Sequence, residues 1–379
     1  MEPTMPAVSS MFTNLSSGFS SSLVACRRRS QGKTRCALDR FLALFARKIP
    51  QLLLVVLASI NVPLAVMAEE SEQRPAVKSP LATKVLLTDS VKLSSGRYVA
   101  VGLYGIIIYS DDQGETWQQA KSPTQVLLTN VFFLNDKLGW VGAHDTVILH
   151  TKDGGETWEI QHEDPIPGGD IPKPVLDIHF TSASNGFAIG AYGLMLKTTD
   201  GGANWESVDT LALYDRLEAL EMEPEPNFNY MIPFGDSILI AGELGTILVF
   251  DPDAVDEEQR WQIIESPYEG TFFGVTQLGS GDIYLYGLRG NIYRSRDQGR
   301  NWEKIETDVI ANIYGCTQLA NGKIVFLGSS GTILTMEAND SQTKKHPYPG
   351  FDTKITAELV DGSDVLMFGS NGVQPFTIN

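Results

Sequence analysis

The sequence predicts an all-β protein built from seven copies of one four-stranded unit. Glycine is frequent, at 35 of 379 residues, and β-branched and aromatic residues recur in short runs between turn-like segments. This composition is typical of strands joined by tight turns. The units repeat every roughly 40–50 residues, a period that with four strands in each unit indicates the blades of a seven-bladed β-propeller.

Residues 51–68 form an apolar stretch that predicts a secretory signal peptide. Arg47 and Lys48 precede the stretch, and small residues end it at Ala68, where we expect cleavage. An uncleaved membrane anchor is the alternative interpretation. The expected localisation is therefore the periplasm.

Residues 1–50 are basic, rich in serine and poor in acidic residues. We interpret them as an over-long bacterial leader with a start codon called too early. The alternative is an organelle transit peptide ahead of a lumenal signal, which would place the protein in an organelle lumen.

Residues 69–379 are expected to form a single, strongly acidic domain. Residues 1–68 hold eight of the 29 basic and two of the 46 acidic residues, so the remainder carries a formal charge of −23. Such a surface repels nucleic acid and anionic headgroups, and no nucleic-acid partner is expected. Cys316 is the only cysteine of this domain. It is therefore expected to be a small buried hydrophobic residue and not part of a disulfide.

The most regular element of the repeat is a pair of glycines three residues apart, between two apolar runs. In the second unit Asp145 replaces the second glycine of the pair. We expect a two-residue turn with positive φ between the glycines, joining the second and third strands of each unit. The first glycines of the pairs are Gly102, Gly142, Gly190, Gly242, Gly287, Gly328 and Gly369.

The two ends of the domain predict how the ring closes. The seventh unit stops after its third strand, whereas the segment from Arg74 resembles a fourth strand leading into the first unit. We therefore expect residues 76–79 to pair with the last blade and complete it, which would cover an exposed strand edge.

A second motif, Ser/Thr-x-Asp-x-Gly-x-Thr/Asn-Trp, follows the third strand in units one, two, three and five. The Asp can accept backbone N–H groups across the turn, the Thr or Asn can add a side-chain bond, and the Trp starts the fourth strand. We interpret the motif as structural, with a carboxylate catalyst or a calcium loop as the alternatives. Its Asp and Trp residues are Asp112, Trp117, Asp153, Trp158, Asp200, Trp205, Asp297 and Trp302.

This motif is the Asp box, or BNR repeat, and residues 74–379 resemble the photosystem II stability/assembly factor-like propellers. Sialidases, xyloglucan hydrolases and sorting receptors share the motif, so it is specific for the fold and weak for function. In the photosynthetic members of the family, as the resemblance implies, an arginine-rich patch engages a reaction-centre protein. Only eight arginines follow residue 68 here, and this departure points to the bacterial, non-photosynthetic branch.

No catalytic site is predicted. A sialidase needs an arginine triad drawn from separate blades, yet four of the eight arginines fall within one unit. The histidines show no metal-ligand spacing. We therefore expect no enzymatic activity, no cofactor and no metal. A sialidase-like glycoside hydrolase or a glycan-binding propeller is the alternative.

The predicted binding surface is the face that carries the turns between second and third strands, because its turns include residue types favoured at interaction hot spots. The candidates are Tyr104, His144, Tyr192, Glu243 and Arg289. Leucines at helical spacing over residues 211–220 predict a short amphipathic helix over this face, as a lid or partner contact. A helix packed on the rim is the alternative.

These features together predict a non-catalytic exported propeller, monomeric on its own, that acts as a scaffold or assembly factor for an envelope membrane protein complex. An inner-membrane transporter is the expected partner.

Overall fold

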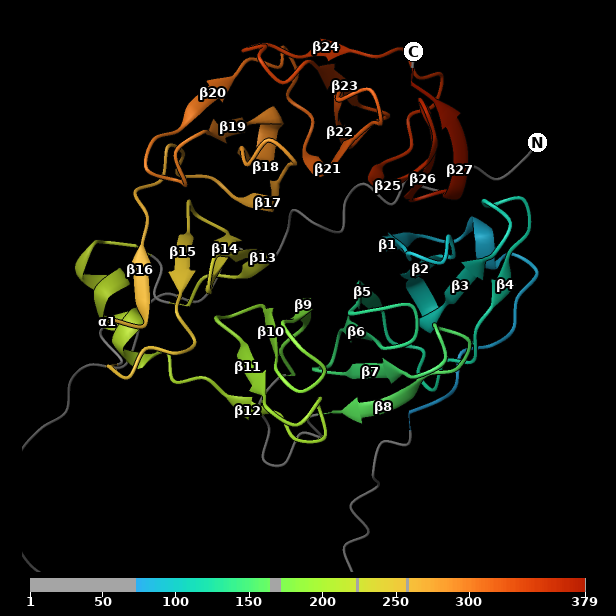
Figure 1. Cartoon of the computed structure of the whole chain (residues 1–379), viewed down its shortest axis with the longest axis horizontal. Helices are drawn as coiled ribbons and strands as arrows, with labels where there is room; N and C mark the ends of the chain where they lie inside the picture. The colour runs from blue at the N-terminus through green and yellow to red at the C-terminus, as the bar shows by residue number, and fades with distance from the viewer. Residues whose placement is uncertain (1–72, 164–171, 223–224, 257–258, 379) are drawn as a thin grey trace, which may run out of the picture. The chain divides into compact units, whose positions relative to one another are not determined.

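The computed structural model describes residues 73–163, 172–222, 225–256 and 259–378. Within these ranges, seven antiparallel sheets stand around a central axis (Figure 1). The predicted seven-bladed β-propeller is confirmed. The predicted leader and signal peptide, residues 1–50 and 51–68, lie outside the described residues.

Blades one to six contain four strands each, paired in sequence order from the central axis outward. Blades one to three comprise β1 (Leu87–Lys92), β2 (Tyr98–Gly102), β3 (Ile107–Ser110), β4 (Gln118–Gln119), β5 (Leu128–Phe133), β6 (Gly139–Ala143), β7 (Ile148–Thr151), β8 (Glu159–His162), β9 (Val175–Phe180), β10 (Gly186–Gly190), β11 (Met195–Thr198) and β12 (Glu206–Ser207). Blades four to six comprise β13 (Phe228–Phe234), β14 (Ser237–Gly242), β15 (Ile247–Phe250), β16 (Trp261–Ile263), β17 (Phe272–Gln277), β18 (Ile283–Gly287), β19 (Ile292–Ser295), β20 (Glu303–Ile305), β21 (Ile313–Gln318), β22 (Ile324–Gly328), β23 (Ile333–Met336) and β24 (Lys344–Lys345). Blade seven has three strands, β25 (Lys354–Asp361), β26 (Asp364–Gly369) and β27 (Gly372–Thr377).

The turn between β2 and β3 shows why most units contain two glycines. Gly102 has an extended backbone, but a Cβ there would lie 2.1 Å from the carbonyl oxygen of Leu86. The next residue, Leu103, donates its N–H to that same carbonyl at 3.0 Å. Positive φ occurs instead at Tyr104 (62°) and Gly105 (67°). The central pair of the turn therefore lies one residue later than predicted, because the first glycine serves close backbone approach.

Hydrogen bonds between neighbouring blades line the central channel. Each inner strand has a register shift near its start. In blades one to three, the residue at this bulge is an Asp or Asn whose side chain accepts a backbone N–H from the next blade. These bonds run from Val131 to Asp89 (2.9 Å), from Ile178 to Asn130 (3.3 Å) and from Met231 to Asp177 (2.7 Å).

The predicted strand closure of the ring is wrong. No described residue adds a fourth strand to blade seven, and Ala76 instead donates its N–H to the carbonyl of Ser122, beside blade one, at 3.0 Å. The β26–β27 ladder runs without a register shift through Pro375, which has no N–H. The proline nitrogen therefore faces the outer edge, where it cannot donate to a further strand.

Side-chain packing closes the ring between blades one and seven. Leu87 and Tyr98 of blade one belong to the same buried cluster as Leu366 and Phe368 of blade seven. The hydroxyl of Tyr98 also donates to the carbonyl of Leu359 at 2.9 Å. The closure thus depends on apolar burial with a few directional bonds across it.

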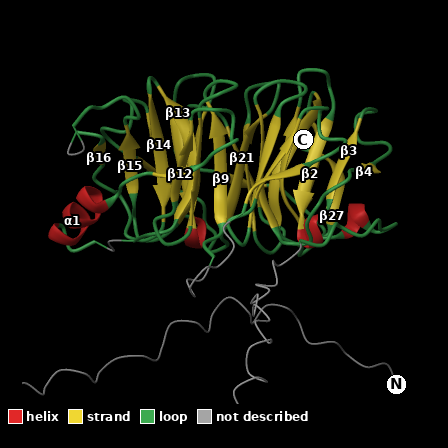
Figure 2. Ribbon diagram, turned by 90° about the horizontal axis from the view of Figure 1, so that it is seen from below, coloured by secondary structure: helices red, strands yellow, loops and turns green. Residues whose placement is uncertain are grey.

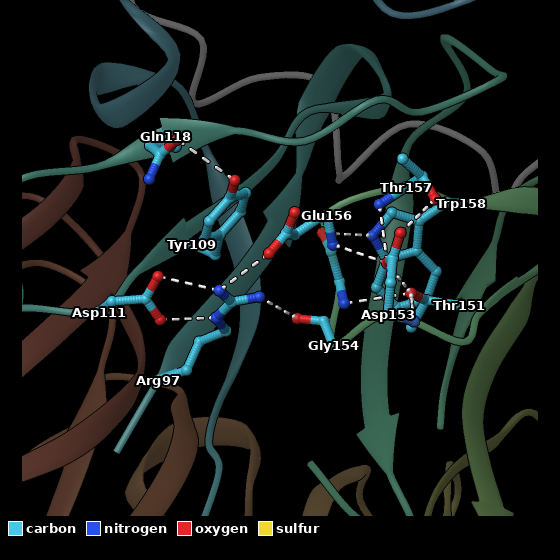
Figure 3. A network of polar contacts seen from close by, with 11 residues as sticks. Arg97, Tyr109, Asp111, Gln118, Thr151, Asp153, Gly154, Glu156, Thr157 and Trp158 are labelled. Carbon is cyan, nitrogen blue, oxygen red and sulfur yellow. Dashed lines mark hydrogen bonds and ion pairs between the residues drawn. The ribbon is translucent and has the colours of Figure 1, made fainter. Parts of the chain in front are cut away.

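The Asp box of blade two shows the hydrogen bonds that its residue types allow (Figure 3). Asp153 accepts the hydroxyl of Thr151 at 2.8 Å and the backbone N–H of Thr157 at 3.0 Å. The indole of Trp158 donates to the carbonyl of Gly155 at 3.0 Å. In blade one, the corresponding bonds from Thr116 lower the pKa of Asp112 to about 2.

Arg97 joins the Asp boxes of blades one and two (Figure 3). Its guanidinium donates to the Asp111 carboxylate at 2.7 Å, the Gly154 carbonyl at 2.9 Å and the Glu156 carboxylate at 3.2 Å. The same group lies over the Tyr109 ring, 4.5 Å from its centre. These bonds fix the turn of one blade against the strand of its neighbour.

We predict that Arg97→Met lowers the free energy of unfolding by about 1–3 kcal/mol, because the stem still packs but the charged hydrogen bonds are lost. Urea unfolding monitored by tryptophan fluorescence measures this change. Arg300→Met is the matched control, since Arg300 is exposed and its loss should change stability little. Equal stability of the two variants would contradict the role assigned to Arg97.

Candidate interaction face

The turns between second and third strands lie together on one side of the propeller, which we call the turn face. Two of them form the short 3₁₀ helices η3 (Leu103–Gly105) and η4 (Leu288–Gly290). Figure 2 shows the helices along one edge of the ring, together with α1 (Leu211–Ala219). The Asp boxes join the opposite ends of the third strands, so they lie on the other side.

Three large side chains project from the tips of these turns in a strained backbone conformation. Tyr104 and Tyr192 are 61% and 58% exposed, and Arg289 is also exposed. Their φ angles are 62°, 55° and 56°, in the left-handed region that bulky residues rarely adopt. Because an exposed side chain contributes little to the core, the strain motivates a functional interpretation of these tips.

Asparagines that precede the inner strands hold two of the tips in place. The side-chain oxygen of Asn227 accepts the N–H of Tyr192 at 2.8 Å, and that of Asn312 accepts the N–H of Arg289 at 3.2 Å. Lys173 also donates to the Tyr192 carbonyl at 2.8 Å. The sequence signal for these supports is an Asn directly before an apolar inner strand, which was not part of the predicted site.

The other two candidates occupy a different position. His144 and Glu243 lie one residue before the tip and are half-buried. The Glu243 carboxylate accepts the backbone N–H of Asn227 at 3.0 Å, so it supports the turn locally. Asp145 and Leu244 occupy the tips in blades two and four, with φ of 60° and 52°. The structure therefore brings three of the five predicted residues to the tips and adds Asp145 and Leu244.

The amphipathic helix expected over residues 211–220 is present as α1. Leu213 and Leu217 are fully buried in a cluster with Phe228 and Trp261 of blade four. The hydroxyl of Tyr214 donates to the carbonyl of Gly193 at 3.1 Å. The helix is thus packed on the rim, outside β16 (Figure 1), which is the alternative that the sequence left open. Within the described ranges no helix is long and apolar enough to cross a membrane.

A cavity of about 310 Å³ lies in the central channel, lined by inner-strand residues that include Asp89, Asn130 and Cys316. None of its lining residues is an arginine, so the triad that a sialidase needs does not converge there. The described residues also contain no group of three or more His, Cys, Asp or Glu side chains that could hold a metal ion.

Burial raises the pKa values of the carboxyl groups around this channel. The pKa of Asp89 rises to about 7 and that of Glu358 to about 8, and the pKa of Asp177 also rises well above its usual range. Asp89 is partly exposed to the channel. The surrounding protein still removes much of the water from its carboxyl group, which disfavours the charged form. Burial likewise raises the pKa of the Cys316 thiol, which disfavours a reactive thiolate.

The fold and the Asp boxes define an Asp-box β-propeller. The chain belongs to the family described as Photosynthesis system II assembly factor YCF48, whose sequence model matches residues 66–171 and 168–351. A curated relative, "Photosystem II assembly lipoprotein Ycf48" of Synechococcus sp. (strain CC9902), is 30% identical over 128 residues. That match covers 33% of this chain and 34% of the relative, so it spans about a third of the relative's length.

Two solved structures share the fold. "YCF48 bound to D1 peptide" matches with a TM-score of 0.59 and 16% identity, covering 81% of this chain and 100% of the other. "YCF48 from Cyanidioschyzon merolae" matches with a TM-score of 0.62 and 15% identity, covering 79% and 97%. At these identities the likeness shows the fold alone. The descriptions of the family and of the curated relative refer to photosystem II assembly and give no support to the expected non-photosynthetic branch.

Because the pKa of Asp89 is raised in the folded protein, the unfolded chain releases this proton at lower pH. The free energy of unfolding should therefore fall as the pH rises from about 4 through about 7. Over this range the folded protein binds up to roughly one more proton at Asp89 than the unfolded chain does. Asp89→Asn should make this fall shallower. Denaturation midpoints between about pH 4 and 8 measure the slope, and an unchanged slope in the variant would refute the assignment.

Relief of strain at a tip should stabilise the fold. Tyr104→Asn is expected to raise the free energy of unfolding by up to about 1 kcal/mol, because Asn tolerates the left-handed region better than Tyr. Thermal unfolding by calorimetry tests this expectation. A loss of stability would show that the Tyr104 ring contributes to the fold itself.

Proposed function

We propose that this protein is a non-catalytic assembly factor that binds a segment of a D1-like photosystem II reaction-centre protein through its turn face. The observation that carries the proposal is membership of the Photosynthesis system II assembly factor YCF48 family. A solved member of the same fold, named for its bound D1 peptide, supports the choice of partner. The transporter partner expected from the sequence has no support among these relatives.

The chemistry of the turn face suits a polypeptide ligand. Tyr104 and Tyr192 present aromatic rings that can cover apolar side chains and also form hydrogen bonds. Arg289 presents a guanidinium that can bind a carboxylate or a peptide carbonyl. Because the turns are held by backbone hydrogen bonds to the blades, these groups are held in position before a partner arrives, which limits the entropic cost of binding.

Export of the chain belongs to the same proposal. The curated relative is named a lipoprotein, which places that protein at a membrane surface. The apolar stretch at residues 51–68 is the segment of this chain that would direct export. The proposal therefore locates the propeller on the side of the membrane to which a signal peptide delivers it.

We predict that synthetic peptides tiling the D1 sequence include at least one that binds the full chain. The combined variant Tyr104→Asn, Tyr192→Asn and Arg289→Asn should weaken that binding at least about tenfold, because it removes hot-spot side chains while suiting the left-handed turns. Fluorescence anisotropy with labelled peptides measures the affinity.

Arg300→Asn provides a matched control, since Arg300 lies in the Asp box of blade five on the opposite face and is exposed. It should bind the peptide as the unaltered protein does. The proposal is overturned if no D1 peptide binds, and its site is overturned if the combined variant binds with unchanged affinity.

A further inference from the structure

A cavity of about 680 Å³ opens between α1, the turn of blade four and the link into blade five. The end of α1 contributes Leu220, the turn contributes Leu244, and the link contributes Ile264 and Tyr268. Most of its lining is therefore apolar and comes from three separate segments, which is the form of a preformed binding groove.

The two leucines at the mouth of this cavity are not explained by the fold. Leu220 is 58% exposed and Leu244 is 52% exposed. Leu244 also has a φ of 52°, a conformation that is unfavourable for a branched side chain and would suit Asn or Gly. An exposed Leu in a strained turn lowers stability without filling the core, so a role in recognition is indicated.

The charges around the cavity are negative. Glu265 and Glu269 line it and are exposed. Glu218 and Glu221 are exposed at the C-terminal end of α1, where the helix dipole disfavours negative charge. Glu218 and Glu221 therefore do not stabilise the helix.

The one basic lining residue, Arg216, contributes one positive charge against the two negative charges of Glu265 and Glu269. Arg216 donates to the backbone carbonyl of Trp261 at 2.7 Å, which ties its guanidinium to blade four. The cavity thus combines an apolar floor with an acidic rim, and the rim favours a partner that carries positive charge.

We propose that this cavity binds an amphipathic polypeptide segment of a partner protein. Apolar side chains of the segment lie between Leu220 and Leu244, and flanking Lys or Arg side chains face Glu265 and Glu269. Apolar burial supplies affinity, and the acidic rim sets the direction of the segment. A second copy of this chain is a poor occupant, because residues 69–379 carry a formal charge of −23 and two copies repel.

This inference does not rest on the proposed function, because it uses a different part of the turn face. A test uses the full chain and a short fluorescein-labelled peptide of Leu, Phe and Lys at near-physiological salt. Its counterpart has Glu in place of every Lys. The Lys peptide should bind at least about tenfold more tightly than the Glu peptide, because like charges at the rim oppose the latter.

Leu244→Asn removes the apolar side chain from a turn whose backbone favours Asn, so folding is preserved. We expect it to weaken binding of the Lys peptide about tenfold, as loss of one buried Leu contact implies. Glu265→Gln together with Glu269→Gln should weaken binding and reduce its dependence on salt. Val255→Asn is the matched control, since Val255 is 99% exposed and does not line the cavity.

Equal binding of the two peptides overturns the proposal, as does unchanged binding by Leu244→Asn. Analytical ultracentrifugation tests the remaining occupant: dimers formed by the unaltered chain and lost in Leu244→Asn would assign the cavity to a second copy instead. The variant with Asn at the three tips should keep the Lys peptide while it loses D1 peptides. Failure of one proposal is therefore distinguishable from failure of the other.

Discussion

The hydrogen bond between each second-to-third-strand turn and the start of the same blade determines the architecture of the turn face. In blade one it joins Leu103 to the carbonyl of Leu86, and bonds of the same kind recur in all seven blades. At Gly102 the two backbones approach too closely for a Cβ, whereas blade two forms the same bond with Ala143 at this position. This hydrogen bond therefore fixes the position of each tip relative to the link that leads into the same blade.

In the central channel, contacts between blades are made by side chains that accept backbone N–H groups. Its bulges direct Asp89 and Asp177 toward backbone N–H groups of the next blade. The role that the structure shows for these acidic residues is to join neighbouring blades. In blades four to seven the bulge residue is Tyr, Gly, Gly and Thr, and no such carboxylate bond is formed there. We therefore interpret these inward-facing carboxyl groups as structural, and we expect the binding sites on the turn face and beside α1.

The number of blades could be predicted from the sequence because the glycine pairs and Asp boxes impose local geometry. The details that could not be predicted are tertiary. The nitrogen of Pro375 blocks a further strand only because of the ladder register, which the sequence does not reveal. Tyr104 and Leu244 occupy the same position in their turns, but Tyr104 was chosen as a candidate for its residue type and Leu244 was not. The contact of Asn227 with Tyr192 joins two blades, so it could not be inferred from the sequence although both supporting asparagines directly precede an inner strand.

The three-stranded last blade has a consequence for how such a ring can change over evolutionary time. Among the described residues, the N-terminal segment adds no strand to blade seven, and each sheet is formed from one contiguous stretch of chain. Each blade is then a contiguous module, joined to its neighbours by side-chain packing and by a few backbone hydrogen bonds. Duplication, loss or permutation of a module leaves every remaining sheet intact, so selection acts on the interfaces between modules and on their tips.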